Sequence, residues 1–202
     1  MSAATQPADV LQFWFQELDN AKRFAKDLAL DEAIRQRFGA VHLVATRGEL
    51  FSWRATAQGR LAEIIVLDQF SRNMYRDLPP SFAHDAQALT LAQEWVAREL
   101  ENAKNPHENN NLSAEQRAFA YMPFMHSESQ RVHEQAVMLF SQPGLEGYLK
   151  FELAHKAIID QFGRFPHRNA ILGRTSTPDE VAFLKRLARI FETLSPGLLS
   201  IS

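Results

Sequence analysis

The stretch GRLAEIIVLDQFSRNM, residues 59–74, predicts the helix around which the rest of the chain packs. Leu61, Ile65, Asp68 and Arg72 follow one another at steps of four, three and four residues, which places them on one face of a helix. The aliphatic residues between them make most of the remaining circumference apolar as well. We therefore expect a central, buried helix whose last turns bring a carboxylate and a guanidinium to the edge of the core.

The composition is that of a folded, soluble chain with one core. It has 202 residues, of which 46% are hydrophobic, and 22 basic against 24 acidic side chains give a net charge of -2. This length suits a single domain over residues 1–202, and the charge provides no field that would hold nucleic acid. The chain lacks cysteine, a leader-like start and any apolar run near the roughly 20 residues of a membrane helix. We expect a cytoplasmic protein that binds neither nucleic acid nor membranes.

Nearly every apolar pattern in the chain has a helical period, and the glycines and prolines lie between these patterns. The sequence therefore predicts an all-α fold of seven to eight or more antiparallel helices. Asp9 and Asp31 are expected to cap the first two helices. Two further helices are expected at about residues 59–74 and 81–102, followed by an exposed loop at residues 105–111.

Two capping boxes, at residues 113–116 and 127–130, predict the starts of the next helices. Pro123 lacks a backbone donor and disfavours helical geometry at the preceding residue, so we expect a break over residues 121–127. A later helix should run from about Leu145 to a left-handed cap at Gly163. The last helix should begin at Thr177, where TPDE combines a cap, a first-turn proline and a capping-box glutamate.

The stretch FGRFPHRNAILGR, residues 162–174, places three arginines on irregular but rigid backbone between two helices. Arg164, Arg168 and Arg174 carry planar guanidinium groups, which suit bidentate recognition of a carboxylate or phosphate. The same groups would clamp an internal aspartate or glutamate equally well. Both interpretations, a ligand site and structural bracing, remain open.

Three histidines are candidate proton carriers, and two carboxylates could orient them: His126, His155 and His167, with Asp68 or Glu128. His155 lies on an apolar helix face with Phe151, Ile158 and Phe162, where it could also be an ordinary core residue. Asp68 and Arg72 could likewise form a structural ion pair at helical spacing. In either case we expect Asp68 and Arg72 to be largely buried and hydrogen-bonded.

Three motifs resemble the bacterial family described as domain of unknown function 924. They are LDQFSRN at residues 67–73, PFMHSE at 123–128, and the stretch at 162–174 followed by STPDE at 176–180. The likeness extends from FWF at residues 13–15 to FL at 183–184. The resemblance implies an all-helical fold grouped with the tetratricopeptide-like superhelices, and it brings no assigned activity, cofactor or catalytic residue.

Familiar catalytic motifs are incomplete in this chain. HSE at residues 126–128 imitates the H-x-E of zinc deaminases, but the cysteine ligands of that motif are missing. His84 and Asp85 imitate the dyad of helical phosphohydrolases, with His42 and Asp160 as conceivable partners. However, His42 falls on an ordinary helix and Asp85 at a helix start, where an acid is favoured by the dipole. We expect no metal and no cofactor.

Two functions therefore remain open. The first is a pocket that binds a small anionic ligand and is lined by Arg72, Arg164, Arg168 and Arg174. If the protein is an enzyme, the pocket would carry out acid–base chemistry that needs no metal. The alternative is a helical scaffold that binds a protein or peptide partner in an apolar groove, with the polar cluster as internal bracing. Candidates for that groove are Phe13, Trp14, Phe15, Trp53 and Trp95.

Overall fold

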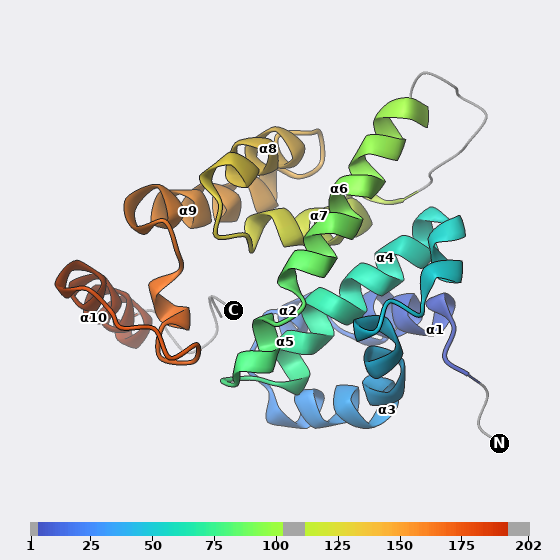
Figure 1. Ribbon diagram of the computed structural model, residues 1–202, viewed down its shortest axis with the longest axis horizontal. Helices are drawn as coiled ribbons and strands as arrows, with labels where there is room; N and C mark the ends of the chain where they lie inside the picture. Colours follow the sequence, from blue (N-terminus) through green and yellow to red (C-terminus); the bar gives the residue numbers. More distant parts are fainter. Residues whose placement is uncertain (1–3, 103–111, 194–202) are drawn as a thin grey trace.

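The structure, a computed structural model, describes residues 4–102 and 112–193. Within these ranges the chain is helical and contains no strand (Figure 1). Of ten α-helical segments, α4 and α5 are joined by a π-helical segment, η3, so nine separate helices are described. The predicted all-α fold is confirmed, while the single domain over residues 1–202 stays a prediction. The predicted loop at residues 105–111 lies outside the described residues.

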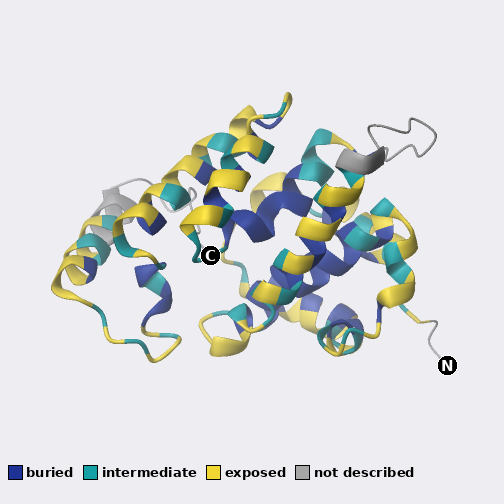
Figure 2. Ribbon diagram, turned by 45° about the horizontal axis from the view of Figure 1, so that its top comes forward, coloured by how far each residue is buried: buried dark blue, intermediate teal, exposed yellow. Residues whose placement is uncertain are grey.

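The central helix consists of α4 (Ala57–Ile65), η3 (Val66–Phe70) and α5 (Ser71–Met74). It begins two residues before the predicted start, because the hydroxyl of Thr56 accepts a hydrogen bond from the amide of Gly59 at 3.0 Å. Every residue from 61 to 74 is buried, and Figure 2 shows the buried residues gathered in the middle of the molecule. The helices that pack against it are α1 (Pro7–Gln12), α3 (Leu28–Thr46), α6 (Asp85–Asn102) and α7 (Ala114–Met125).

The two predicted N-terminal caps are wrong by about one turn. The N-cap of α1 is Gln6, and Asp9 lies inside the first turn, where its carboxylate accepts the Gln6 amide at 2.7 Å. The N-cap of α3 is Asp27, which accepts two amides of the first turn. Asp31 lies within that turn and binds Arg76 at 2.6 Å. First turns favour acids for the same electrostatic reason as caps do, so the sequence pattern placed both caps too late.

The predicted break at residues 121–127 is also misplaced, because α7 continues through Pro123 to Met125. A proline inside a helix costs about 3 kcal/mol or more. Here the turns on both sides, residues 118–125, are completely buried, and this packing outweighs the lost hydrogen bond. The chain breaks instead at residues 126–129.

The other helix boundaries follow the capping signals unevenly. The capping box at residues 113–116 is confirmed, with both of its hydrogen bonds formed. Ser127 is not a cap, because α8 (Gln130–Phe140) begins after Ser129. The helix expected from residue 81 is a short 3-10 segment, η4 (Pro79–Phe82), followed by α6 from Asp85.

The C-terminal part follows the prediction closely. Helix α9 (Glu146–Phe162) ends at Gly163, whose φ of 69° is left-handed, and the short segment η5 (Pro166–Arg168) follows. Helix α10 (Pro178–Thr193) begins after Thr177, whose hydroxyl and amide exchange hydrogen bonds with Glu180. In Figure 1, α10 lies at one end of the molecule and α1 towards the other, with η5 between α9 and α10. This arrangement holds the 162–174 stretch between the main core and the last helix.

A glycine substitution tests the packing at the start of the central helix. A Cβ at Gly59 would lie 1.9 Å from the carbonyl oxygen of Trp53, so Gly59→Ala should lower the free energy of unfolding by about 1–3 kcal/mol. The matched control is Gly39→Ala in α3, where no atom lies within 4 Å of the added group. There alanine should raise the stability by about 0.5–1 kcal/mol. Urea unfolding of both variants measures the difference, and equal effects would contradict the close approach at Gly59.

Candidate functional site

Asp68 and His126 form a buried hydrogen-bonded pair at the end of the central helix. Asp68 lies in the π-helical segment η3, and His126 is the residue that follows α7. Nδ1 of His126 lies 2.8 Å from Oδ1 of Asp68, while Nε2 of Gln69 donates to Oδ2 at 2.6 Å. The carboxylate thus has a partner on each oxygen, which fixes its orientation.

The charges around this pair define its protonation. Burial alone would raise the pKa of Asp68, but the charge of Arg72 and the hydrogen bonds from His126 and Gln69 hold it well below its usual range. Burial and the charge of Arg72 lower the pKa of His126, and Asp68 opposes this only in part. His126 is therefore neutral at pH 7, donates its Nδ1 proton to an ionised Asp68, and keeps a lone pair on Nε2. That Nε2 accepts no hydrogen bond from any described residue.

Two arginines, Arg72 and Arg168, converge on a second carboxylate, that of Asp85. Arg72 places Nη1 at 2.9 Å from Oδ1 of Asp68 and donates Nη2 to Oδ2 of Asp85 at 3.0 Å. Arg168 donates Nη1 to the same Asp85 oxygen at 3.0 Å and Nη2 to the backbone carbonyl of His126 at 3.1 Å. The four charged side chains and His126 therefore form one continuous network.

Aromatic rings enclose the guanidinium of Arg168. Its carbon Cζ lies 4.5 Å from the ring centroid of Phe82 and 4.6 Å from that of Phe165. Burial and the charge of Arg72 lower the pKa of Arg168 to about 10, so the group remains a cation at neutral pH. The cation is thus held by contacts with two aromatic rings as well as by hydrogen bonds.

The two remaining candidate histidines pack on the ring of Phe165. Their ring centroids lie 5.7 Å (His155) and 5.5 Å (His167) from that of Phe165. Burial lowers the pKa of His155 to about 4 and, together with Arg168, that of His167 to about 3. Nδ1 of His155 donates to the carbonyl of Phe151 at 2.7 Å, whereas both ring nitrogens of His167 are buried without a partner. His167 is therefore a neutral ring with two unused hydrogen-bonding positions.

Arg164, Arg174 and Glu128 form separate ion pairs that hold the 162–174 stretch. Arg174 makes a bidentate contact with Glu128 at 2.6 and 2.9 Å, and Arg164 makes one with Glu180 at 2.6 and 2.8 Å. Glu128 also accepts the backbone amide of Phe165 at 2.7 Å. These contacts fix the backbone of the 162–174 stretch, which carries Arg168 and His167.

The structure brings some of the predicted site residues together and separates others. Asp68, Arg72, His126 and Arg168 lie in one network, and the expected burial and hydrogen bonding of Asp68 and Arg72 is confirmed. Arg164, Arg174 and Glu128 lie outside the network, and their role in ligand binding stays a prediction. Sequence reasoning missed Asp85 and Phe82 as members of the site. Their only local signal is a helix start after two prolines, which indicates nothing about the arginines they contact.

The phosphohydrolase-like residues come together only in part. The rings of His42 and His84 lie 5.9 Å apart, but Asp85 binds the two arginines, and Asp160 pairs with Lys156 at 2.6 Å elsewhere on the molecule. Nε2 of His42 lies 2.8 Å from the hydroxyl of Ser71. Within residues 4–102 and 112–193, no group of three or more histidine, aspartate and glutamate side chains is arranged to hold a metal ion.

Comparison with known proteins identifies the family of this chain. The family model "Bacterial protein of unknown function (DUF924)" matches residues 10–187. The chain belongs to the DUF924 family. All residues of the network, from Asp68 to Arg168, lie within the span that matches this family. No curated protein matches the chain.

A solved structure shares this fold. It is that of the protein of unknown function ATU0120 from Agrobacterium tumefaciens, which is 36% identical to the chain and gives a TM-score of 0.80. The match covers 89% of this chain and 97% of the other. Among the described residues, no helix combines the length and apolar character that crossing a membrane requires.

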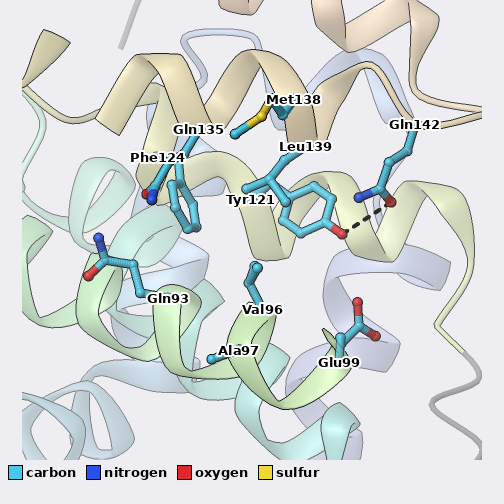
Figure 3. Close-up of a pocket in the computed structure, with 10 residues that line it drawn as sticks. All are labelled: Gln93, Val96, Ala97, Glu99, Tyr121, Phe124, Gln135, Met138, Leu139 and Gln142. Atoms are coloured by element: carbon cyan, nitrogen blue, oxygen red, sulfur yellow. Dashed lines mark hydrogen bonds between the residues drawn. The ribbon is translucent and has the colours of Figure 1, made fainter. Parts of the chain in front are cut away.

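A groove lies away from the network, between α6, α7 and α8 (Figure 3). It has a volume of about 530 Å³, and its apolar lining includes Val96, Phe124 and Leu139. The hydroxyl of Tyr121 points to Gln142 at one end, as Figure 3 shows. None of the five aromatic residues proposed for a groove lines this one. Phe13, Trp14 and Trp95 are buried in the core, where aromatic residues at helical spacing contribute most to packing.

Replacement of Arg72 tests whether the network depends on balanced charge. Arg72→Met leaves the buried carboxylate of Asp68 without its cation, so the free energy of unfolding should fall by about 3–5 kcal/mol. Arg98→Met is the matched control, because Arg98 and its partner Glu94 are about half exposed. That variant should change stability by less than about 1 kcal/mol. Chemical unfolding of both variants provides the comparison, and an unchanged Arg72→Met would show that the pair contributes little.

Replacement of His167 tests whether burial lowers the pKa of its ring. Its folded pKa of about 3 lies below the usual 6.5, so the unfolded chain binds more protons between these values and stability falls as the pH is lowered from 6.5. His167→Phe removes this proton uptake. Between pH 6.5 and about 5, above the range where carboxylates titrate, the fall should become shallower by up to about 1.4 kcal/mol per pH unit. Urea unfolding across this range measures it, and an unchanged slope would mean that His167 titrates freely.

Proposed function

We propose that the protein binds a small anionic metabolite, a carboxylate or a phosphate, at Arg72 and Arg168, and that it carries out metal-free acid–base chemistry with His126 as the proton carrier. One observation carries this proposal. Asp68 fixes Nδ1 of His126, and Arg168 donates to the backbone carbonyl of the same histidine. A proton acceptor and a cation are therefore held next to each other on rigid parts of the chain.

The histidine has the properties that a general base requires. A carboxylate on Nδ1 sets the tautomer, so that Nε2 presents its lone pair, and it stabilises the imidazolium that forms when a proton is taken up. The lowered pKa of His126 keeps it unprotonated at neutral pH and ready to accept. His155 and His167 supply two further neutral rings near Arg168. These rings are candidates for the second proton transfer that acid–base chemistry needs.

The arginines have the properties that recognition of an anion requires. Their positions are fixed before binding, by Asp68 and Asp85 for Arg72 and by two aromatic rings for Arg168. Little side-chain freedom is then lost when an anion binds, and the low local polarity strengthens each contact. In this proposal the ion pairs of Arg164, Arg174 and Glu128 keep the loop in place.

The alternative function is a tetratricopeptide-like scaffold for a protein or peptide partner. It is favoured by the groove over α7, which has an apolar lining and is formed by consecutive helices that pack on one another. In this case the charged network would only brace the fold. Such bracing predicts that added anions do not stabilise the protein, which separates the two functions experimentally.

The test is thermal unfolding with sodium phosphate, acetate and succinate, compared with chloride at constant ionic strength. At about ten times the dissociation constant, a bound anion should stabilise the native protein by about 1.4 kcal/mol. Arg168→Lys should lose this response, because an ammonium cannot reproduce the fork of donors. The exposed control Arg98→Lys should keep it.

Arg168→Lys is also expected to lower the melting temperature without anions, since Arg168 is already paired with Asp85. The anion response, and not the melting temperature itself, is therefore the decisive quantity. If no anion raises the melting temperature of the native protein above its value in chloride, the proposed function is wrong and the scaffold becomes the better account.

A further inference from the structure

We infer that the ligand is a monoanionic carboxylate that takes the place of the Asp85 side chain between Arg72 and Arg168. This inference rests on the proposed function and makes Asp85 an internal competitor for the site. In the described conformation, Asp85 occupies the position that the carboxylate group of the ligand would take. Binding would then be an exchange of one carboxylate for another.

The hydrogen bonds around Asp85 use only part of what the site offers. A single oxygen, Oδ2, accepts from both Arg72 and Arg168 at 3.0 Å. The other oxygen, Oδ1, lies 2.9 Å from Nη1 of Arg72 as an ion-pair contact but accepts no hydrogen bond. Nε of Arg72 and Nε of Arg168 are likewise buried without a partner. Unmade hydrogen bonds of buried groups are costly, so a carboxylate that moves freely into place can gain contacts that the tethered Asp85 does not make.

Asp85 is also the member of the network that can leave most easily. Its side chain is 20% exposed, whereas those of Asp68, Arg72 and Arg168 are 1–5% exposed. Asp68 is bound by Gln69 and His126, and the guanidinium of Arg168 contacts two aromatic rings. Among the described residues, only the two arginines donate hydrogen bonds to the side chain of Asp85. Rotation of Asp85 into solvent would therefore leave the two arginines in position.

The balance of charge identifies the class of ligand. Asp68 and Asp85 carry two negative charges and Arg72 and Arg168 two positive ones, so the buried network is neutral. A monocarboxylate that replaces Asp85 preserves this neutrality. A phosphate dianion would leave an uncompensated negative charge in a buried site, which is strongly unfavourable. A planar carboxylate also matches the planar donor edges of the two guanidinium groups.

The experiment removes the internal carboxylate and supplies a free one. Asp85→Ala removes a group of the size of formate, so thermal unfolding is measured with sodium formate and acetate, and with phosphate and chloride at the same ionic strength. Formate should stabilise Asp85→Ala at a half-saturating concentration about tenfold lower than in the native protein, as expected if Asp85 vacates the site roughly a tenth of the time. Adding Arg168→Lys to this variant should abolish the response.

Asp160→Ala is the matched control, because Asp160 is an exposed aspartate paired with Lys156. Its formate response should equal that of the native protein. If Asp85→Ala does not fold, Asp85→Asn keeps the shape and removes the charge, and its formate response must still exceed that of the native protein.

The possible results separate this inference from the proposed function. A native protein that responds to anions, with no gain in the Asp85 variants, overturns the exchange but leaves the proposed function standing. A stronger response of Asp85→Ala to phosphate than to formate overturns the monocarboxylate class. A response of Asp85→Ala to formate, with a native protein that responds to no anion, identifies Asp85 as a permanent structural partner and overturns both.

Discussion

The ion pair between Asp68 and Arg72 is the interaction on which the rest of the site depends. A buried carboxylate is stable only when a cation and hydrogen bonds replace the water it has lost. Arg72 and His126 meet this need for Asp68, and Arg72 in turn contacts Asp85. Asp85 then allows a second buried cation, Arg168, at a position 83 residues away in the chain. One buried charge in the central helix thus organises the contacts among α6, α7 and the C-terminal stretch.

Much of the fold could be predicted from the sequence because its signals are local. The central helix, the end of α9 at Gly163 and the start of α10 at Thr177 all depend on residues within one or two turns. Local signals failed where two of them coincide or where distant packing overrides them. Acids in the first turn looked like caps in α1 and α3, and the burial of α7 kept Pro123 within a helix. Neither the position of these caps nor the continuation of α7 through Pro123 is determined by the neighbouring residues in the sequence.

The candidate site was predictable in some of its members but not in its connections. Asp68 and Arg72 are marked by their helical spacing, and Arg168 by the rigid stretch on which it stands. Their common partner Asp85 follows Arg72 by 13 residues and precedes Arg168 by 83, so no periodic pattern links the three. The distinction between Arg168 and its neighbours Arg164 and Arg174 likewise depends on which carboxylate each one meets. Those carboxylates come from elements distant in sequence, whose placement only the folded chain defines.

The π-helical segment at Val66–Phe70 sets the phase between the two halves of the central helix. A π-helical turn holds about one residue more than an α-helical turn, because its hydrogen bonds join residues five apart instead of four. In an uninterrupted α-helix one extra residue would rotate everything after it by about 100° about the axis. The wide turn accommodates that residue, so α5 keeps the orientation in which Arg72 contacts Asp68 and Asp85. The reading frame of side chains along this helix, and not only their identity, is therefore part of what assembles the charged network.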